Sequence, residues 1–382
     1  MITTQSIETA EVSSRRKVLY IIHVDWQWIK QRPQFLAETL AEYHDVLVLH
    51  RKCIRPGIQL TASRTSIPRL PLLPVPWSWK PLRWATIPVQ QEWVALMARR
   101  FDPDTIWLTY PSLIETIPAE LAHLPIVYDC MDDVLGFPSS PKRLALLARL
   151  ERDLIGRAAA IVCSSDRLRD LLLSRYGRGI EPKLSLVRNG VSQALIETTG
   201  AVAAIEAAPG NRLQIAYFGT IAEWLNFDVL LAALDNNPHV EFHLVGPISI
   251  ANVPRHERLK FHKPMRHDEL ARFAAYFDGF VMPFRLNPLT EAVDPVKLYE
   301  YLAFGKEVIA VRYKEIERFS PFVHFYRSLP EFLELIDRLA LRTIERKNTA
   351  TERSAFLAQS TWHARCNQVC QLLAGLDRTI TV

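Results

Sequence analysis

The chain has 382 residues, of which 49% are apolar and 23% charged, and its formal net charge is +5. This composition is typical of a folded protein with two or three domains and excludes a disordered chain. Five scattered cysteines argue against a disulfide framework. The mild basicity suits anionic ligands, but no nucleic-acid-binding signature accompanies it, so we expect no nucleic acid partner. Because no apolar run has the form of a signal peptide or a membrane span, we expect a cytoplasmic protein.

The first half of the chain alternates short apolar runs with helical periodicity. Strands are predicted at Val18–Ile22, Asp45–Leu49, Thr105–Leu108, Ile126–Tyr128, Ala160–Cys163 and Leu184–Val187. Helices are predicted at Gln31–Glu42, Leu113–Ala122, Lys142–Ala158 and Ser165–Tyr176. Strand and helix in alternation indicate a parallel sheet with helices on both faces.

The segment Pro68–Trp93 departs from this pattern, since it is rich in proline and holds four tryptophans, Trp77, Trp79, Trp84 and Trp93. So much proline predicts neither a regular helix nor a central strand. Clustered tryptophans near cations favour a membrane interface or an acceptor-binding surface. The alternative is a long loop packed over the first domain by its own aromatic side chains.

A second alternating series follows the weakly patterned stretch 194–212, where we place the domain boundary. Its predicted strands are Leu213–Phe218, Val240–Val245, Leu259–Phe261, Gly279–Met282, Val308–Val311 and Val323–Tyr326. Its predicted helices are Phe227–Asp235, His267–Tyr276, Pro295–Phe304 and Leu329–Ala340, and Thr351–Leu376 adds one or two more. Residues 1–200 and 210–358 therefore form two doubly wound α/β domains, with 359–382 as a terminal helical segment. Ligands of such sheets bind outside the carboxyl ends of the strands.

The stretch PVKLYEYLAFGKEVIAV, residues 295–311, carries the clearest chemical pattern. Pro295 would open a helix whose free amides and positive dipole form an anion site. Lys297 adds a full charge for a diphosphate, and Glu300, one turn later, can accept hydrogen bonds from vicinal ribose hydroxyls. The alternative is a surface Lys–Glu pair three residues apart, which contributes a few tenths of a kcal/mol.

This stretch resembles the donor-site helix of GT-B glycosyltransferases and the glutamate signature of their large retaining family. The resemblance implies two Rossmann-like domains facing a cleft and a C-terminal helix that crosses back to the first domain. Glu300 matches the second glutamate of the signature, whereas the first would fall on Ala292. Retention or inversion of the sugar configuration therefore stays open.

The resemblance extends along the donor domain. Residues 215–234 look like its first strand, turn and helix, in which Gly219 would let the backbone approach phosphate. Relatives carry phosphate-binding Arg and Lys where this chain has Thr220 and Leu225, so the resemblance assigns the phosphate to Lys297 and Arg285. The stretch FHLVGP looks like the next strand, which ends at Gly246.

Two segments of the first domain look suited to the acceptor and to catalysis. Residues 23–41 look like the cleft loop and helix of transferases of bacterial teichuronic-acid and exopolysaccharide assembly. Asp25, Trp26, Trp28 and Arg32 are its candidate acceptor residues, with the tryptophans stacking on a sugar and Arg32 holding an acidic sugar or lipid phosphate. Simple packing of the loop by the tryptophans is the alternative.

Three carboxylates, Asp129, Asp132 and Asp133, follow a predicted strand. The segment resembles the strand end of an inverting glucuronosyltransferase of xanthan-type assembly, whose base aspartate matches Asp132. His23 is a second candidate base, and a helix cap or solvated turn is the alternative for the aspartates.

The sequence thus predicts a glycosyltransferase that moves a sugar from a nucleotide-sugar, with UDP-sugar the favoured donor, to a saccharide or polyprenol-linked glycan in cell-surface polysaccharide biosynthesis. The resemblance implies no metal and no other cofactor. Peripheral contact with the inner face of the cytoplasmic membrane would run through Pro68–Trp93. The alternatives are a nucleotide-sugar 2-epimerase and an inactive glycan-binding or scaffold protein.

Overall fold

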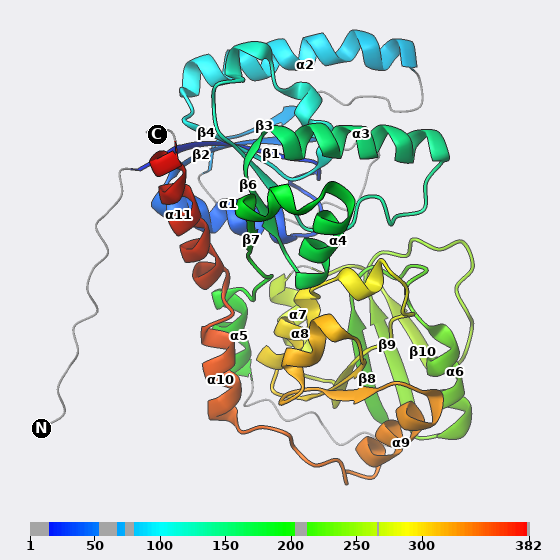
Figure 1. Ribbon diagram of the computed structural model, residues 1–382. Helices are drawn as coiled ribbons and strands as arrows, with labels where there is room; N and C mark the ends of the chain where they lie inside the picture. The colour runs from blue at the N-terminus through cyan, green and yellow to red at the C-terminus, as the bar shows by residue number, and fades with distance from the viewer. Residues whose placement is uncertain (1–14, 53–66, 73–79, 203–211, 266, 380–382) are drawn as a thin grey trace, which may run out of the picture.

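The protein, seen in a computed structural model that describes residues 15–52, 67–72, 80–202, 212–265 and 267–379, contains two parallel β-sheets in separate α/β layers (Figure 1). The first sheet has the order β3-β2-β1-β4-β5-β6-β7, and the second has the order β10-β9-β8-β11-β12-β13. In both, the order reverses beside the first strand of the domain, which is the doubly wound arrangement. The predicted α/β fold with two Rossmann-like domains is confirmed.

The first sheet is built from apolar runs that are buried on both faces. Its strands are β1 (Lys17–Ile22), β2 (Asp45–Arg51), β3 (Arg69–Leu72), β4 (Thr105–Leu108), β5 (Ile126–Cys130), β6 (Ala158–Cys163) and β7 (Leu184–Leu186). Tyr20 and Ile22 pack beneath α1 (Arg32–Tyr43), whereas Leu19 and Ile21 pack beneath α2 (Lys80–Phe101) and α3 (Pro141–Arg157). Helix α4 (Asp166–Tyr176) completes the layer.

Two predictions about this domain are wrong. The run Leu113–Ala122 forms two 3₁₀ turns, η1 (Pro111–Thr116) and η2 (Ala119–Leu121), because Pro118 between them cannot donate a helical hydrogen bond. The segment Pro68–Trp93 is not one irregular loop, since β3 lies at its start and α2 at its end. Pro88 lies inside α2 on its exposed side, where the ring is tolerated because Val94 and Ala98 anchor the helix to the sheet. Trp77 and Trp79 lie outside the described residues.

The second sheet repeats this plan. Its strands are β8 (Leu213–Phe218), β9 (Val240–Val245), β10 (Leu259–His262), β11 (Gly279–Met282), β12 (Glu307–Val311) and β13 (His324–Tyr326). Its helices are α6 (Phe227–Asn236), α7 (His267–Ala274), α8 (Val296–Ala303) and α9 (Leu329–Ala340), and α5 (Gln193–Val202) precedes the sheet. Ring contacts among Phe218, Phe280 and Tyr301 fix α8 against the centre of the sheet.

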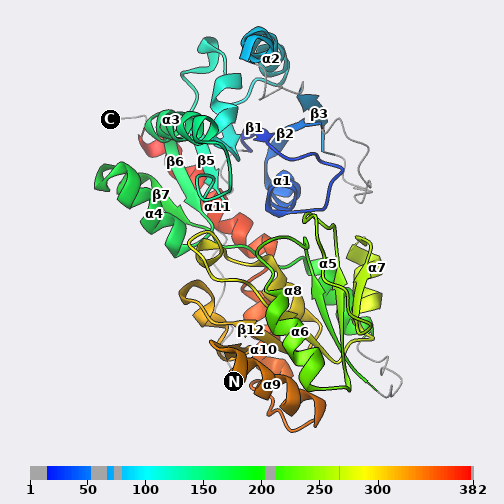
Figure 2. The same cartoon turned by 90° about the vertical axis from the view of Figure 1, so that its right-hand side faces the viewer.

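The C-terminal helices bring the chain back to the first domain, as Figure 2 shows. Helix α10 (Ala350–Ala358) lies along the second domain, and α11 (Trp362–Thr379) packs on α1. Trp362 stacks on Phe35 of α1 with ring centroids 5.1 Å apart. The predicted return of the last helix is therefore observed, and it ties the two domains together beside the linker, residues 187–192 between β7 and α5.

Candidate functional site

A cavity of about 370 Å³ lies where the carboxyl ends of the two sheets meet. Segments that follow β1 and β5 form its wall in the first domain, and segments that follow β8, β9 and β11, with the start of α8, form its wall in the second. The cavity thus occupies the position at which doubly wound sheets bind ligands.

Two glycines shape the wall contributed by the second domain. Gly219 and Gly246 end β8 and β9 with φ of 156° and 151°, a conformation that favours glycine. A Cβ on Gly246 would lie 1.9 Å from the Gly219 carbonyl oxygen, so the two turns touch backbone to backbone. Thr220 follows in the same wall. These turns place glycine backbone in the lining of the cavity, and their role in binding phosphate stays a prediction.

Helix α8 begins at this cavity, and both of its candidate donor residues line it. Pro295 is the N-cap, so the helix starts at Val296, one residue later than predicted. The Lys297 ammonium donates to the Glu300 carboxylate at 2.7 Å. Glu300 is 3% exposed. The pair is therefore not the surface salt bridge of the alternative interpretation, because it faces the cavity between the domains.

Arg285 does not join this group. Its guanidinium is half exposed, pairs with Asp228 at 2.9 Å and is not among the residues that line the cavity. Leu225, in the place of a basic residue of relatives, is 1% exposed and belongs to the core. The assignment of phosphate charge to Arg285 is wrong in this geometry, and among the residues that the structure describes Lys297 is the cation of the second domain that lines the cavity.

The three aspartates after β5 have separate environments. Asp129 is fully buried and accepts from Arg32 Nε at 3.0 and 3.2 Å. Asp133 accepts from both terminal nitrogens of Arg175. The Asp132 carboxylate forms no ion pair with a described arginine or lysine side chain, and it lines the cavity. Asp129 and Asp133 are engaged in ion pairs, so of these three aspartates it is Asp132 that lines the cavity.

Asp132 also lines a second cavity, of about 320 Å³, inside the first domain. Burial raises the pKa of its carboxyl to about 7, although the charge of Arg32 opposes the shift. His23 lines this second cavity too, stacks on Tyr110 and bonds to Thr109 Oγ1 at 2.9 Å. Burial, together with the charge of Arg51, lowers the pKa of His23 to about 4. At neutral pH the second cavity is thus lined by a neutral imidazole, that of His23, and by the Asp132 carboxyl, which titrates near that pH.

The predicted acceptor residues are not assembled at the cavity. Trp26 is 1% exposed and packs in the core, so it cannot stack on a sugar and the prediction for it is wrong. Asp25 caps its own turn by accepting from Gln27 N at 3.0 Å, and Trp28 lies in that turn outside the lining of both cavities. Arg32 lines the cavity, but its charge is neutralised by Asp129. An acidic ligand would have to compete with the buried Asp129 carboxylate for the Arg32 guanidinium.

Sequence reasoning missed two polar residues of the cleft, Asn189 and Asp294, which both line the larger cavity. Asn189 lies in the VRNGV junction and Asp294 immediately precedes Pro295. A buried position was not evident for either residue from local pattern, because polar residues beside Gly and Pro are typical of exposed turns.

The comparisons with known proteins agree with this architecture. Residues 30–190 match a family described as a glycosyl transferase 4-like domain, and residues 228–371 match one described as glycosyl transferase-like. The first match runs from α1 past the end of β7 in the first domain, and the second runs from α6 through more than half of α11. The chain therefore consists of two glycosyltransferase-like domains, and it has the GT-B fold.

Individual relatives share only a small part of their sequence with this chain. A protein of Bacillus subtilis (strain 168) named as a teichuronic acid biosynthesis glycosyltransferase is 26% identical over 236 residues, which span 58% of this chain and 59% of that protein. Sucrose-phosphate synthase from Thermosynechococcus elongatus superposes with a TM-score of 0.69 at 15% identity, covering 96% of this chain and all of that one. Anabaena HepE in complex with UDP and glucose gives 0.66 at 17% identity, covering 94% and 100%. At such identities the likeness establishes the fold.

Proposed function

We propose that this protein transfers a sugar from a UDP-sugar to a hydroxyl group of a saccharide acceptor in cell-surface polysaccharide biosynthesis. The observation that carries the proposal is the position of Asp132 on the wall shared by two cavities, with Lys297 and Glu300 lining the larger one. The named Bacillus relative and the UDP complex of HepE support the pathway class and the nucleotide.

The larger cavity is the proposed donor site. The diphosphate would lie at the start of α8, against Lys297 and the bare backbone of Gly219 and Gly246. Glu300 would then exchange its lysine partner for the ribose hydroxyls. Lys297 and the helix terminus would stabilise the negative charge that develops on departing UDP. This arrangement needs no metal ion, so we propose that chelators leave transfer intact.

The smaller cavity is the proposed acceptor site. Its aromatic side chains Tyr110 and Phe137 offer faces for a sugar ring, and Asp132 lies at its junction with the donor cavity. The acceptor hydroxyl would give its proton to the Asp132 carboxylate as its oxygen bonds to the anomeric carbon. The bond from that carbon to UDP breaks in the same step, which inverts the configuration.

A lipid-linked acceptor would require the protein to meet a membrane surface. The described part of the chain contains no helix long and apolar enough to span a bilayer. On α2, however, Trp84 is 84% exposed and Val89 is 53% exposed. Helix α3, which lies at the same end of the first domain (Figure 1), exposes Arg149 and Arg152. An exposed indole on α2 and exposed arginines on α3 suit an anionic membrane interface, and we propose peripheral contact there with the inner face of the cytoplasmic membrane.

The test is a thermal-shift and calorimetric screen against UDP, GDP, dTDP and CMP, with Lys297→Ala as the site variant and exposed Lys260→Ala as its control. We expect UDP alone to stabilise the wild type and the control, and to lose affinity at least tenfold in Lys297→Ala. No binding of any nucleotide would refute the proposal in favour of a scaffold. Conversion of the donor to an epimeric nucleotide-sugar, in an incubation without acceptor, would identify an epimerase.

A further inference from the structure

A chain of buried polar side chains crosses the interface between the two domains. It starts at Asp129 of β5, which pairs with Arg32. Arg32 Nη1 donates to Asn189 Oδ1 at 3.1 Å, and Asn189 in turn contacts Asp294. All four side chains are at most 8% exposed. This chain connects the strand end that carries Asp132 with the residue before the N-cap of α8.

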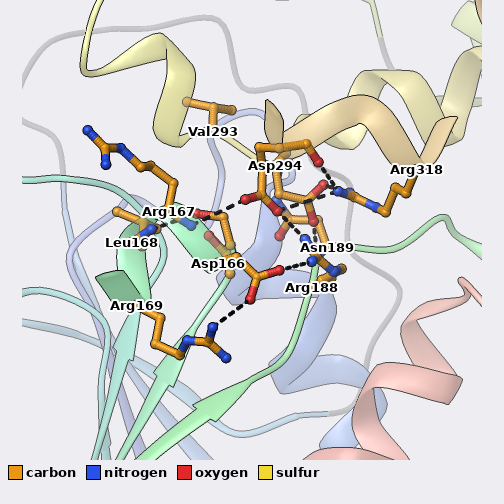
Figure 3. A network of polar contacts seen from close by, with 12 residues as sticks. Asp166, Arg167, Leu168, Arg169, Arg188, Asn189, Val293, Asp294 and Arg318 are labelled. Carbon is orange, nitrogen blue, oxygen red and sulfur yellow. Dashed lines mark hydrogen bonds and ion pairs between the residues drawn. The ribbon is translucent and has the colours of Figure 1, made fainter. Parts of the chain in front are cut away.

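The contact between Asn189 and Asp294, here called the clamp, consists of two hydrogen bonds that Asn189 donates. The Asn189 backbone amide donates to Asp294 Oδ2 at 2.7 Å, and Asn189 Nδ2 donates to the Asp294 carbonyl oxygen at 2.5 Å. Figure 3 shows the Asp294 carboxylate between Asn189 and Arg318, the latter also an ion-pair partner. Tyr299 of α8 donates to the same carboxylate at 3.2 Å. One buried carboxylate therefore joins the linker, the donor helix and the turn after β12.

The linker side of the clamp is itself held in place. Arg365 of α11 donates to the Asn189 carbonyl oxygen at 2.9 Å. A Cβ on Gly190 would lie 2.9 Å from the Ser360 carbonyl oxygen, so the linker and the crossover to α11 touch closely. The backbone at Asn189 is thus anchored to the first domain, and the clamp has a fixed point from which to orient α8.

A buried carboxylate is costly unless donors satisfy it, and Asp294 receives donors from both sides of the interface, namely Asn189 from the linker and Tyr299 and Arg318 from the second domain. A change in the relative position of the domains would break the donation from Asn189 and leave Asp294 with only Tyr299 and Arg318, its partners within the second domain. The domain arrangement in which α8 faces Asp132 is therefore the one that the clamp favours.

We propose that Asn189 and Asp294 are positioning residues of the transfer reaction, which hold the start of α8, and with it the donor diphosphate, in register with Asp132. The proposal rests on the proposed function. It assigns neither residue a contact with the reacting atoms. Loss of the clamp should slow transfer and let water compete for the donor, while the donor contacts within the second domain persist.

The experiment compares Asn189→Ala and Asp294→Asn with Asn237→Ala, a control that removes a 2.9 Å side-chain bond to Asp337 away from the cleft. Calorimetry gives the Kd of UDP, and kinetics give kcat, KM and the ratio of transfer to donor hydrolysis. We expect both clamp variants to bind UDP within threefold of the wild type, to lose at least tenfold in kcat and to hydrolyse a larger share of the donor. The control should match the wild type.

Three results would overturn the clamp. They are unchanged kcat in both variants, a loss of UDP affinity equal to the loss of kcat, or an unchanged partition between transfer and hydrolysis. Should Asp294→Asn fail to fold, adding Arg318→Leu removes the buried guanidinium that has lost its Asp294 partner and restores the test. A wild type that binds no nucleotide would refute the proposed function. Small-angle scattering would then test the clamp independently of the proposed function. The clamp predicts that Asn189→Ala has a larger radius of gyration than the wild type, and an equal radius would refute it.

Discussion

The Asp133 carboxylate accepts two parallel hydrogen bonds from Arg175, with Nη1–Oδ1 at 2.6 Å and Nη2–Oδ2 at 2.7 Å. Asp133 Oδ1 also accepts from Leu135 N at 3.2 Å, which fixes the turn after β5. A Cβ on Gly136 would lie 2.9 Å from Asp133 Oδ2, so the turn closes tightly on this carboxylate. The neighbouring Asp132 is thereby held toward the two cavities. Bidentate pairing at one aspartate thus orients the next as the candidate base.

The rate of transfer should depend on the ionisation of Asp132. Burial raises the pKa of its carboxyl to about 7, and only the ionised form accepts a proton. We expect kcat/KM to rise about tenfold per pH unit below pH 7 and to level off above it. A profile already flat between pH 5 and 8 would exclude Asp132 as the base.

The same carboxyl should reduce stability. A folded-state pKa above the ordinary value of 3.8 means that the folded state binds the proton more tightly, so its stabilising contribution is present below about pH 4 and is lost as pH rises to about 7. Asp132→Asn removes this penalty. We expect the variant to lose transfer yet to gain about 1–3 kcal/mol in the free energy of unfolding at pH 8, after allowance for partial solvent contact. At pH 4 denaturant titrations should show no gain.

Local pattern predicted the fold and the donor helix because both depend on neighbouring residues. Buried parallel strands appear as continuous apolar runs, and α8 places Lys297 and Glu300 three residues apart whatever surrounds it. The predictions for the acceptor residues did not hold because those side chains depend on contacts with residues far away in the sequence. Arg32 looked like a free cation, but its partner Asp129 lies 97 residues away. Trp26 looked like a cleft residue and is buried beneath Arg69 instead.

The close approach of the two glycine turns makes Gly246 sensitive to a single methyl group. In Gly246→Ala the Cβ would meet the Gly219 carbonyl oxygen at 1.9 Å, at a φ of 151°. We expect a loss of about 2–4 kcal/mol in the free energy of unfolding, with UDP affinity reduced as the turns separate. Gly156→Ala, in α3 with open space around it, is the matched control and should be neutral or slightly stabilising. Equal melting temperatures for the two variants would refute the contact.

Phosphate recognition should depend on Lys297 and not on Arg285. Lys297→Met should weaken UDP at least tenfold and leave uridine unaffected, since uridine lacks the diphosphate. Glu300→Gln should weaken both, because the ribose is common to them. Arg285→Gln should change UDP affinity less than twofold, given that this side chain lies outside the cavity lining and pairs with Asp228. Calorimetric titration of UDP and uridine into each variant measures these differences, and a larger effect at Arg285 would reverse the assignment.

Arg32 should matter for stability first and for acidity second. Its guanidinium, 3% exposed, neutralises fully buried Asp129. Arg32→Met should therefore cost about 3–5 kcal/mol, because it leaves an unpaired buried carboxylate. Adding Asp129→Asn should recover most of that loss.

Because the charges of Arg32 and Asp129 act on the pKa of Asp132 in opposite directions, the double variant should keep the midpoint of its pH–rate profile near that of the wild type. The midpoint in Arg32→Met alone should move to higher pH. Chemical denaturation and pH–rate profiles of the wild type, Arg32→Met and the double variant measure these effects. The rival hypothesis is that Arg32 binds the acceptor directly. In that case the double variant would show a raised acceptor KM and no recovery of activity.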